Sequence, residues 1–100
     1  MTRPVIYGFK TESTERLLLQ ALLKSLSDAV SSNDGSAGDR YQRRIRLIAR
    51  HFDTNPLISD ALERLFSASA RWLATSTAKR HEVEQQVQDG IERVIGFSDC

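Results

Sequence analysis

Few side chains in this sequence could do chemistry, and the two histidines come first. In the segment RHEVE, His81 and Glu84 are three residues apart on a predicted helix, a spacing that two ligands of one metal ion can have. A stable site needs three or four ligands, and the sequence lacks the second carboxylate and histidine pair of a two-metal helical bundle. We therefore expect no metal and no cofactor, and we interpret His81 and Glu84 as part of a solvated helix face.

The sequence gives no catalytic nucleophile either. The single cysteine, Cys100, stands at the last position, and no base or helix N-terminus is implied beside it. The glycines of GSAG, Gly35 and Gly38, lack the following lysine and the preceding strand of a phosphate-binding loop. We expect no catalytic residues and a protein that is not an enzyme.

Positive charge is the strongest chemical signal, although the net charge is only +1. Five arginines gather within eleven residues with no acid among them: Arg40, Arg43, Arg44, Arg46 and Arg50. An acidic block follows near the C-terminus: Glu82, Glu84, Asp89 and Glu92. The basic cluster can be a solvated face, can pair with the acidic block, can bind an acidic patch on a protein partner, or can bind phosphates of nucleic acid.

The elements that position these residues are helices. The composition, 40% hydrophobic and 27% charged, is that of a soluble globular chain, and 100 residues suit a single domain spanning residues 1–100. No apolar run approaches the roughly 18 residues of a membrane span, and there is no apolar signal region, so we expect a cytoplasmic protein. The lone cysteine agrees with a reducing compartment.

The first helix is predicted from about Thr11 onward. Its apolar residues recur at spacings of three and four and are expected to face the core: Leu18, Leu19, Leu22, Leu23, Leu26, Ala29 and Val30. Glycines and small polar residues then predict a flexible loop over residues 31–39. The second helix is expected from near Asp39 to about Phe52, with Tyr41, Ile45 and Ile48 buried and Leu47 beside them.

Asn55 and Pro56 predict the start of the third helix, because asparagine caps a helix and proline suits its first turn. Its inward residues are predicted to be Ile58, Leu62, Leu65, Phe66, Ser69, Trp72 and Leu73. Over residues 74–80 the helix either continues or breaks near Ser76. The last helix follows to about Ile95, with Gly96 as its stop. We thus expect an all-α bundle of three to four helices, preceded by a short extended N-terminal arm over residues 1–10.

The segment LIARHFDTNPLISDALERLF resembles the helix-turn-helix motif of bacterial regulators. It has small Ala49, aromatic Phe52 three residues on, a polar turn and a second apolar-patterned helix. The resemblance implies DNA binding through a degenerate motif at about residues 43–66. Against it, Asp60 and Glu63 would stand on the outward face of the reading helix, where carboxylates are repelled by phosphates.

The leading hypothesis is a small non-enzymatic helical protein that binds a protein partner in a regulatory, adaptor or inhibitor role, and forms a homodimer. DNA binding is the alternative. The surface expected to bind the partner or phosphates is Arg40, Arg43, Arg44, Arg46, Arg50 and Arg64. Two sets of residues are expected at the dimer contact. The arm segment PVIYGF exposes apolar side chains and unpaired backbone that a second copy would cover, and it contributes Val5, Tyr7 and Phe9. The narrow apolar stripe of the last helix contributes Val83, Val87, Ile91 and Val94.

Overall fold

Apolar residues at spacings of three and four give each helix of this chain one buried face. The computed structural model describes the backbone of residues 3–98 and the side chains of residues 14–98. The helices are α1 (Arg3–Ser31), α2 (Gly35–Ile48), α3 (Pro56–Ala74) and α4 (His81–Ser98), with short 3-10 turns at Ala49–Phe52 (η1) and Thr77–Lys79 (η2). No strand occurs within residues 3–98. The all-α prediction is therefore confirmed, with four helices.

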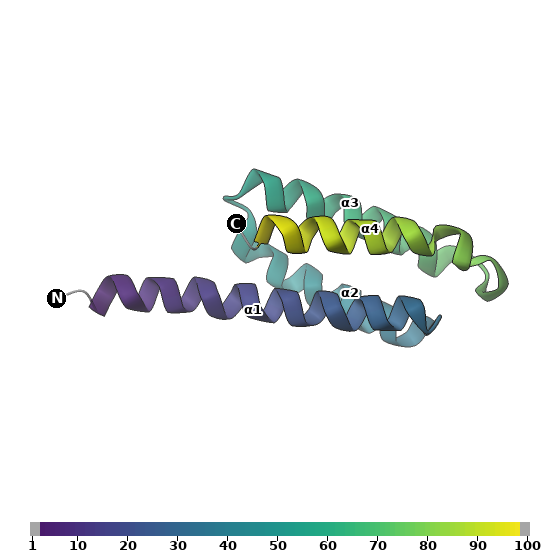
Figure 1. The fold of residues 1–100 in the computed structure, drawn as a ribbon, viewed down its shortest axis with the longest axis horizontal. Helices are drawn as coiled ribbons and strands as arrows, with labels where there is room; N and C mark the ends of the chain where they lie inside the picture. The colour runs from purple at the N-terminus through teal and green to yellow at the C-terminus, as the bar shows by residue number, and fades with distance from the viewer. Residues whose placement is uncertain (1–2, 99–100) are drawn as a thin grey trace.

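The four helices run alternately in opposite directions along the long axis, and the N-terminal part of α1 extends beyond the other three (Figure 1). α4 packs mainly against α3 and α1, while α2 packs against α1 and α3. α2 and α4 therefore lie at diagonal corners of the bundle. Residues from all four helices and η1 share one core: Leu19, Leu23, Leu26, Val30, Ile45, Ile48, Phe52, Ile58, Ala61, Leu62, Leu65, Trp72, Val87, Ile91 and Val94.

The apolar stripe of α1 is wider than the surface that its neighbours cover. Most of the predicted inward residues are buried, and Leu22 is partly buried, but the side chain of Leu18 is 50% exposed. Leu47 of α2 was expected beside the buried stripe and is 68% exposed. The predicted burial of Leu18 is thus wrong, because no other helix packs over that edge of α1.

α1 is helical from Arg3, whereas the sequence predicted an extended arm over residues 1–10. The side chains of residues 1–13 lie outside the part of the chain that the structure describes. The described residues therefore do not decide the arm, and its expected dimer contacts, Val5, Tyr7 and Phe9, stay predictions.

The connection between α1 and α2 is shorter than the loop predicted over residues 31–39. Asn33 adopts a left-handed backbone with φ of 55°, and its N–H donates to the Val30 carbonyl at 3.0 Å. The next N–H, of Asp34, donates to the Ala29 carbonyl at 2.9 Å, which completes a Schellman turn. The Asp34 carboxylate then accepts from the Ala37 N–H at 3.1 Å and caps α2. The predicted loop is therefore corrected to a tight turn at residues 32–34.

α2 begins at Gly35 rather than near Asp39 because its small residues are needed for close packing. Gly38 is buried against the ring of Trp72, and a Cβ at Gly38 would stand 2.6 Å from the Trp72 Cζ3 atom. The glycine lowers helix propensity, but it lets the two helices approach each other. Tertiary contact therefore overrides the local preference that predicted a loop.

The start of α3 is as predicted. The Asn55 side chain accepts from the N–H groups of Leu57 at 3.1 Å and Ile58 at 3.3 Å, and Pro56 occupies the first turn. The open question over residues 74–80 is settled as a break, since α3 ends at Ala74 and α4 begins at His81. Gly96 is not a stop, because α4 continues through it to Ser98.

Arg80 holds the break between α3 and α4, a role that the sequence analysis missed. Its guanidinium donates from Nε to the carbonyls of Trp72 and Thr75, both at 3.2 Å. It also lies 4.7 Å from the centre of the Trp72 ring and donates to the Asn33 side chain at 3.3 Å. These contacts satisfy carbonyls at the end of α3 and tie that end to the turn after α1.

Candidate functional site

The outer face of α2 carries most of the predicted arginine surface. Burial of Gly38, Gln42, Ile45 and Ile48 on one side of α2 leaves the opposite side in solvent. The 3.6-residue period then places Leu47 on that side together with Arg40, Arg43 and Arg44, and Arg50 follows in η1; the side chains of all five are exposed. We call these five residues the α2 outer face.

The arginines on α2 differ in what they contact. The Arg43 Nε lies 3.1 Å from the Asp39 carboxylate, one turn earlier on the same helix. The Arg46 guanidinium lies 4.7 Å from the centre of the Phe66 ring, so it sits at the junction with α3. Arg40 lies 5.9 Å from the centre of the Tyr41 ring. Within residues 14–98, the structure describes no ion pair for Arg40, Arg44 or Arg50.

Arg64 is not part of the same surface. It lies on α3, where its Nε is 3.2 Å from the Asp60 carboxylate, and it lines a shallow hollow with Gln86 of α4. The predicted binding set is therefore divided between α2 and the far side of α3.

The acidic block does not meet the basic one. Its residues lie on α4, which is diagonally across the bundle from α2. Among the described side chains, no ion pair joins the two blocks. On the α2 outer face, Arg43 therefore pairs with Asp39 of the same helix, and the acidic block neutralises none of the other arginines among the described side chains.

An apolar groove runs beside the α2 outer face, between α1 and α2. It encloses about 390 Å³ and is lined by Leu18, Leu22, Arg44, Leu47, Ile48 and His51. The groove was not predicted from the sequence. Leu18 was expected in the buried stripe of the first helix, and Leu47 was expected beside the buried stripe of the second. Their exposed fractions, 50% and 68%, could not be read from periodicity.

The stripe expected to form a dimer seam on α4 is used inside the chain. Val87, Ile91 and Val94 are between 0 and 2% exposed and pack into the core, and Val83 is partly buried against it. The assignment of these valines and Ile91 to a dimer contact is corrected, because α1 and α3 already cover this face of α4.

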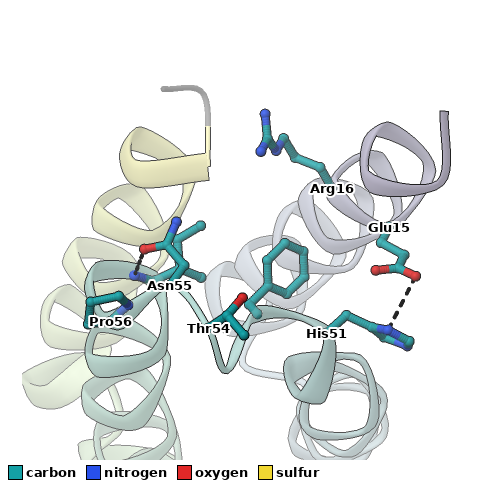
Figure 2. Close-up of a pocket in the computed structure, with 8 residues that line it drawn as sticks. Glu15, Arg16, His51, Thr54, Asn55 and Pro56 are labelled. Carbon is teal, nitrogen blue, oxygen red and sulfur yellow. Dashed lines mark hydrogen bonds and ion pairs between the residues drawn. The ribbon is translucent and has the colours of Figure 1, made fainter. Parts of the chain in front are cut away.

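A second hollow, of about 340 Å³, lies where α1, η1 and the start of α3 meet. Figure 2 shows the His51 Nδ1 facing the Glu15 carboxylate, at 3.2 Å, with Arg16 pointing away from this pair. The Asn55 side chain, which caps α3, occupies the opposite wall. A histidine and carboxylate pair can act in acid–base catalysis, but it needs a reacting group in reach. No hydrogen bond described for residues 14–98 links His51 to a hydroxyl or thiol group.

The structure also bears on metal and membrane chemistry. Among the side chains of residues 14–98, no three histidine, cysteine, aspartate or glutamate residues gather as a metal-ion cluster. None of the helices in this range combines the length and the apolar character that a membrane crossing requires.

The resemblance to helix-turn-helix regulators is not matched by the arrangement of the helices. In that motif the second helix crosses the first at a large angle and enters the major groove. Here α2 and α3 lie along the same axis in opposite directions (Figure 1), and α3 packs against α4 as well.

Comparisons of this chain with protein-family models, with curated proteins and with solved structures found no match.

Proposed function

We propose that this chain is a non-enzymatic helical protein that binds a protein partner through the α2 outer face. One observation carries the proposal: exposed Leu47 stands in the middle of exposed arginines and borders an apolar groove. Contiguous apolar surface with a charged rim is typical of protein-binding sites on small soluble proteins. Arginine is also enriched at protein interfaces, where its planar head and apolar stem both make contacts.

The apolar part of the surface favours a protein over nucleic acid. A backbone-binding surface needs cations and hydrogen-bond donors, and leucine side chains contribute nothing to phosphate binding. Leu18 and Leu47 gain free energy only where another apolar surface removes them from water. DNA binding is kept as the alternative because Arg44 and Arg50 could still bind phosphates.

The homodimer is not needed for this proposal. The seam that the sequence suggested on α4 is filled by the chain itself, and the arm contacts at Val5, Tyr7 and Phe9 are outside the described side chains. Light scattering of the purified chain at tens of micromolar measures the oligomeric state directly.

The test is capture from a lysate of the source organism, with and without nuclease, using the tagged chain. The variant carries Arg44→Glu and Arg50→Glu, and the matched control carries Arg93→Glu, an exposed arginine on α4. We expect a protein that is retained after nuclease treatment, is lost with the double variant and is kept with the control.

The alternative predicts a different result. If capture disappears with nuclease, and mixed duplex DNA binds the chain with a steep salt dependence that the double variant abolishes, the surface binds phosphates. That result would replace the protein partner with nucleic acid.

A further inference from the structure

We infer that the groove between α1 and α2 receives an amphipathic helix from a different protein, with leucine-type anchors flanked by carboxylates. The inference rests on the proposed function and names the chemistry of the partner. The groove is lined by residues of α1 and α2, which run in opposite directions along the bundle (Figure 1). A helix laid along such a groove presents anchors at positions i, i+3 or i+4, and i+7.

The groove is apolar where an anchor would enter. Leu18 and Leu22 form the α1 wall, and Leu47 and Ile48 form the α2 wall. Ile48 belongs to the core, so it gives the groove a fixed floor. The volume of about 390 Å³ lies in the range of ligand-sized sites. The partner therefore inserts bulky aliphatic side chains here.

Charge around the groove selects a partner with carboxylates. Arg44 is part of the groove wall, and Arg40 on α2 and Arg50 on η1 are also exposed. Of the nearby acids, Asp39 pairs with Arg43 on α2, and Glu15 lies against the groove residue His51, so the three arginines outnumber the one remaining carboxylate. The remaining charge is positive, so acidic residues beside the anchors are attracted and basic ones are repelled.

A second copy of this chain does not fit as the occupant in a two-fold arrangement centred on Leu47. A two-fold axis at Leu47 would place the same surface on both sides of the interface. Arg40, Arg44 and Arg50 of one copy would then face the same residues of the other. Like charges brought together in this way repel each other at an interface. The occupant therefore presents the opposite charge to the groove.

The experiment uses three fluorescein-labelled synthetic peptides with the same helix-forming backbone. The first carries leucine anchors with glutamate flanks, the second leucine anchors with lysine flanks, and the third alanine in place of leucine with glutamate flanks. Anisotropy titrations use the full chain at low salt. We expect the leucine–glutamate peptide to bind at least roughly tenfold more tightly than either of the others, because both parts of the groove are needed.

Variants of the chain locate the binding. Leu47→Asp is expected to weaken binding of the leucine–glutamate peptide by roughly tenfold or more. Leu57 is an exposed leucine outside the groove lining, so Leu57→Asp is expected to leave this binding unchanged. Arg44→Glu is expected to weaken binding of the leucine–glutamate peptide and to tighten binding of the leucine–lysine peptide. Arg93→Glu makes the same change of charge on α4 and is expected to affect neither preference. Circular dichroism of each variant confirms that it is folded.

Several results overturn the inference. These are equal binding of the glutamate and lysine peptides, no binding of the leucine–glutamate peptide, or binding that Leu47→Asp leaves intact. A dimer in light scattering that Leu47→Asp dissociates would make a second copy the occupant. If the peptides fail while lysate capture still depends on Arg44 and Arg50, the groove inference is wrong and the proposed function stands.

Discussion

Arg80 joins the ends of three helices, and replacing it with alanine tests whether this contact stabilises the bundle. Its Nε–H is shared between the Trp72 and Thr75 carbonyls at 3.2 Å. One terminal nitrogen donates to the Leu73 carbonyl at 3.4 Å, and the other donates to the Asn33 side chain at 3.3 Å. The guanidinium also stacks over the Trp72 ring, with 4.7 Å from its carbon to the ring centre.

The expected loss of stability follows from these contacts. Hydrogen bonds to a charged group contribute roughly 1.5–3 kcal/mol when short and shielded. Those of Arg80 are 3.2–3.4 Å long, and the side chain is only partly buried, so water replaces part of each one. The stacked ring contact contributes about 0.5–1 kcal/mol. We therefore expect Arg80→Ala to lower the free energy of unfolding by about 2–3 kcal/mol.

The measurement is urea unfolding followed by circular dichroism, with thermal unfolding as a second readout. For a domain of this size, the expected loss corresponds to a decrease in Tm of roughly 8–24 °C. Arg80→Lys retains the charge but cannot reach the carbonyls and Asn33 together, so its loss is expected to be intermediate. Arg93→Ala removes an exposed arginine from α4 and is expected to change the free energy by less than about 0.5 kcal/mol.

A loss with Arg80→Ala no greater than that with Arg93→Ala would refute the reasoning. It would mean that water satisfies the end of α3 as well as the guanidinium does. If Arg80→Lys lowers the free energy of unfolding as much as Arg80→Ala does, the effect is assigned to the planar geometry of the guanidinium and not to its charge.

Two further substitutions test the packing around α2. Gly38→Ala places a Cβ 2.6 Å from the Trp72 ring, so it should lower the free energy of unfolding, measured in urea, by about 1–3 kcal/mol. The control is Gly96→Ala, whose Cβ meets nothing within 4 Å and which should be neutral or stabilising. If both glycine variants behave alike, the close packing at Gly38 is not what positions α2. Ile48→Ala should lower the free energy of unfolding by about 2–4 kcal/mol, because the side chain is in the core. Leu47→Ala changes its exposed neighbour and should lower that free energy by less than about 0.5 kcal/mol. Equal losses would contradict the outward orientation of Leu47.

Part of the candidate site could be predicted from the sequence. Arg40, Arg43, Arg44, Arg46 and Arg50 form one basic cluster in the sequence, and the sequence leaves open whether it is solvated, pairs with the acidic block or binds a partner. The structure leaves the side chains of Arg40, Arg43, Arg44 and Arg50 exposed. The groove beside them could not be predicted, because helical periodicity shows which side of a helix is apolar but not how much of that side a neighbour covers.

The sequence by itself determined the all-α class, the start of α3 at Asn55 and Pro56, and the clustering of arginines at residues 40–50. These features depend on local propensity, capping and the 3.6-residue period, which act within a few residues. Only the tertiary structure decided that Gly38 belongs to a helix, that Val87 and its neighbours face the chain's own core, and that Leu18 and Leu47 remain in solvent. Each of those outcomes depends on which surface lies opposite the residue, and that surface comes from a distant part of the chain.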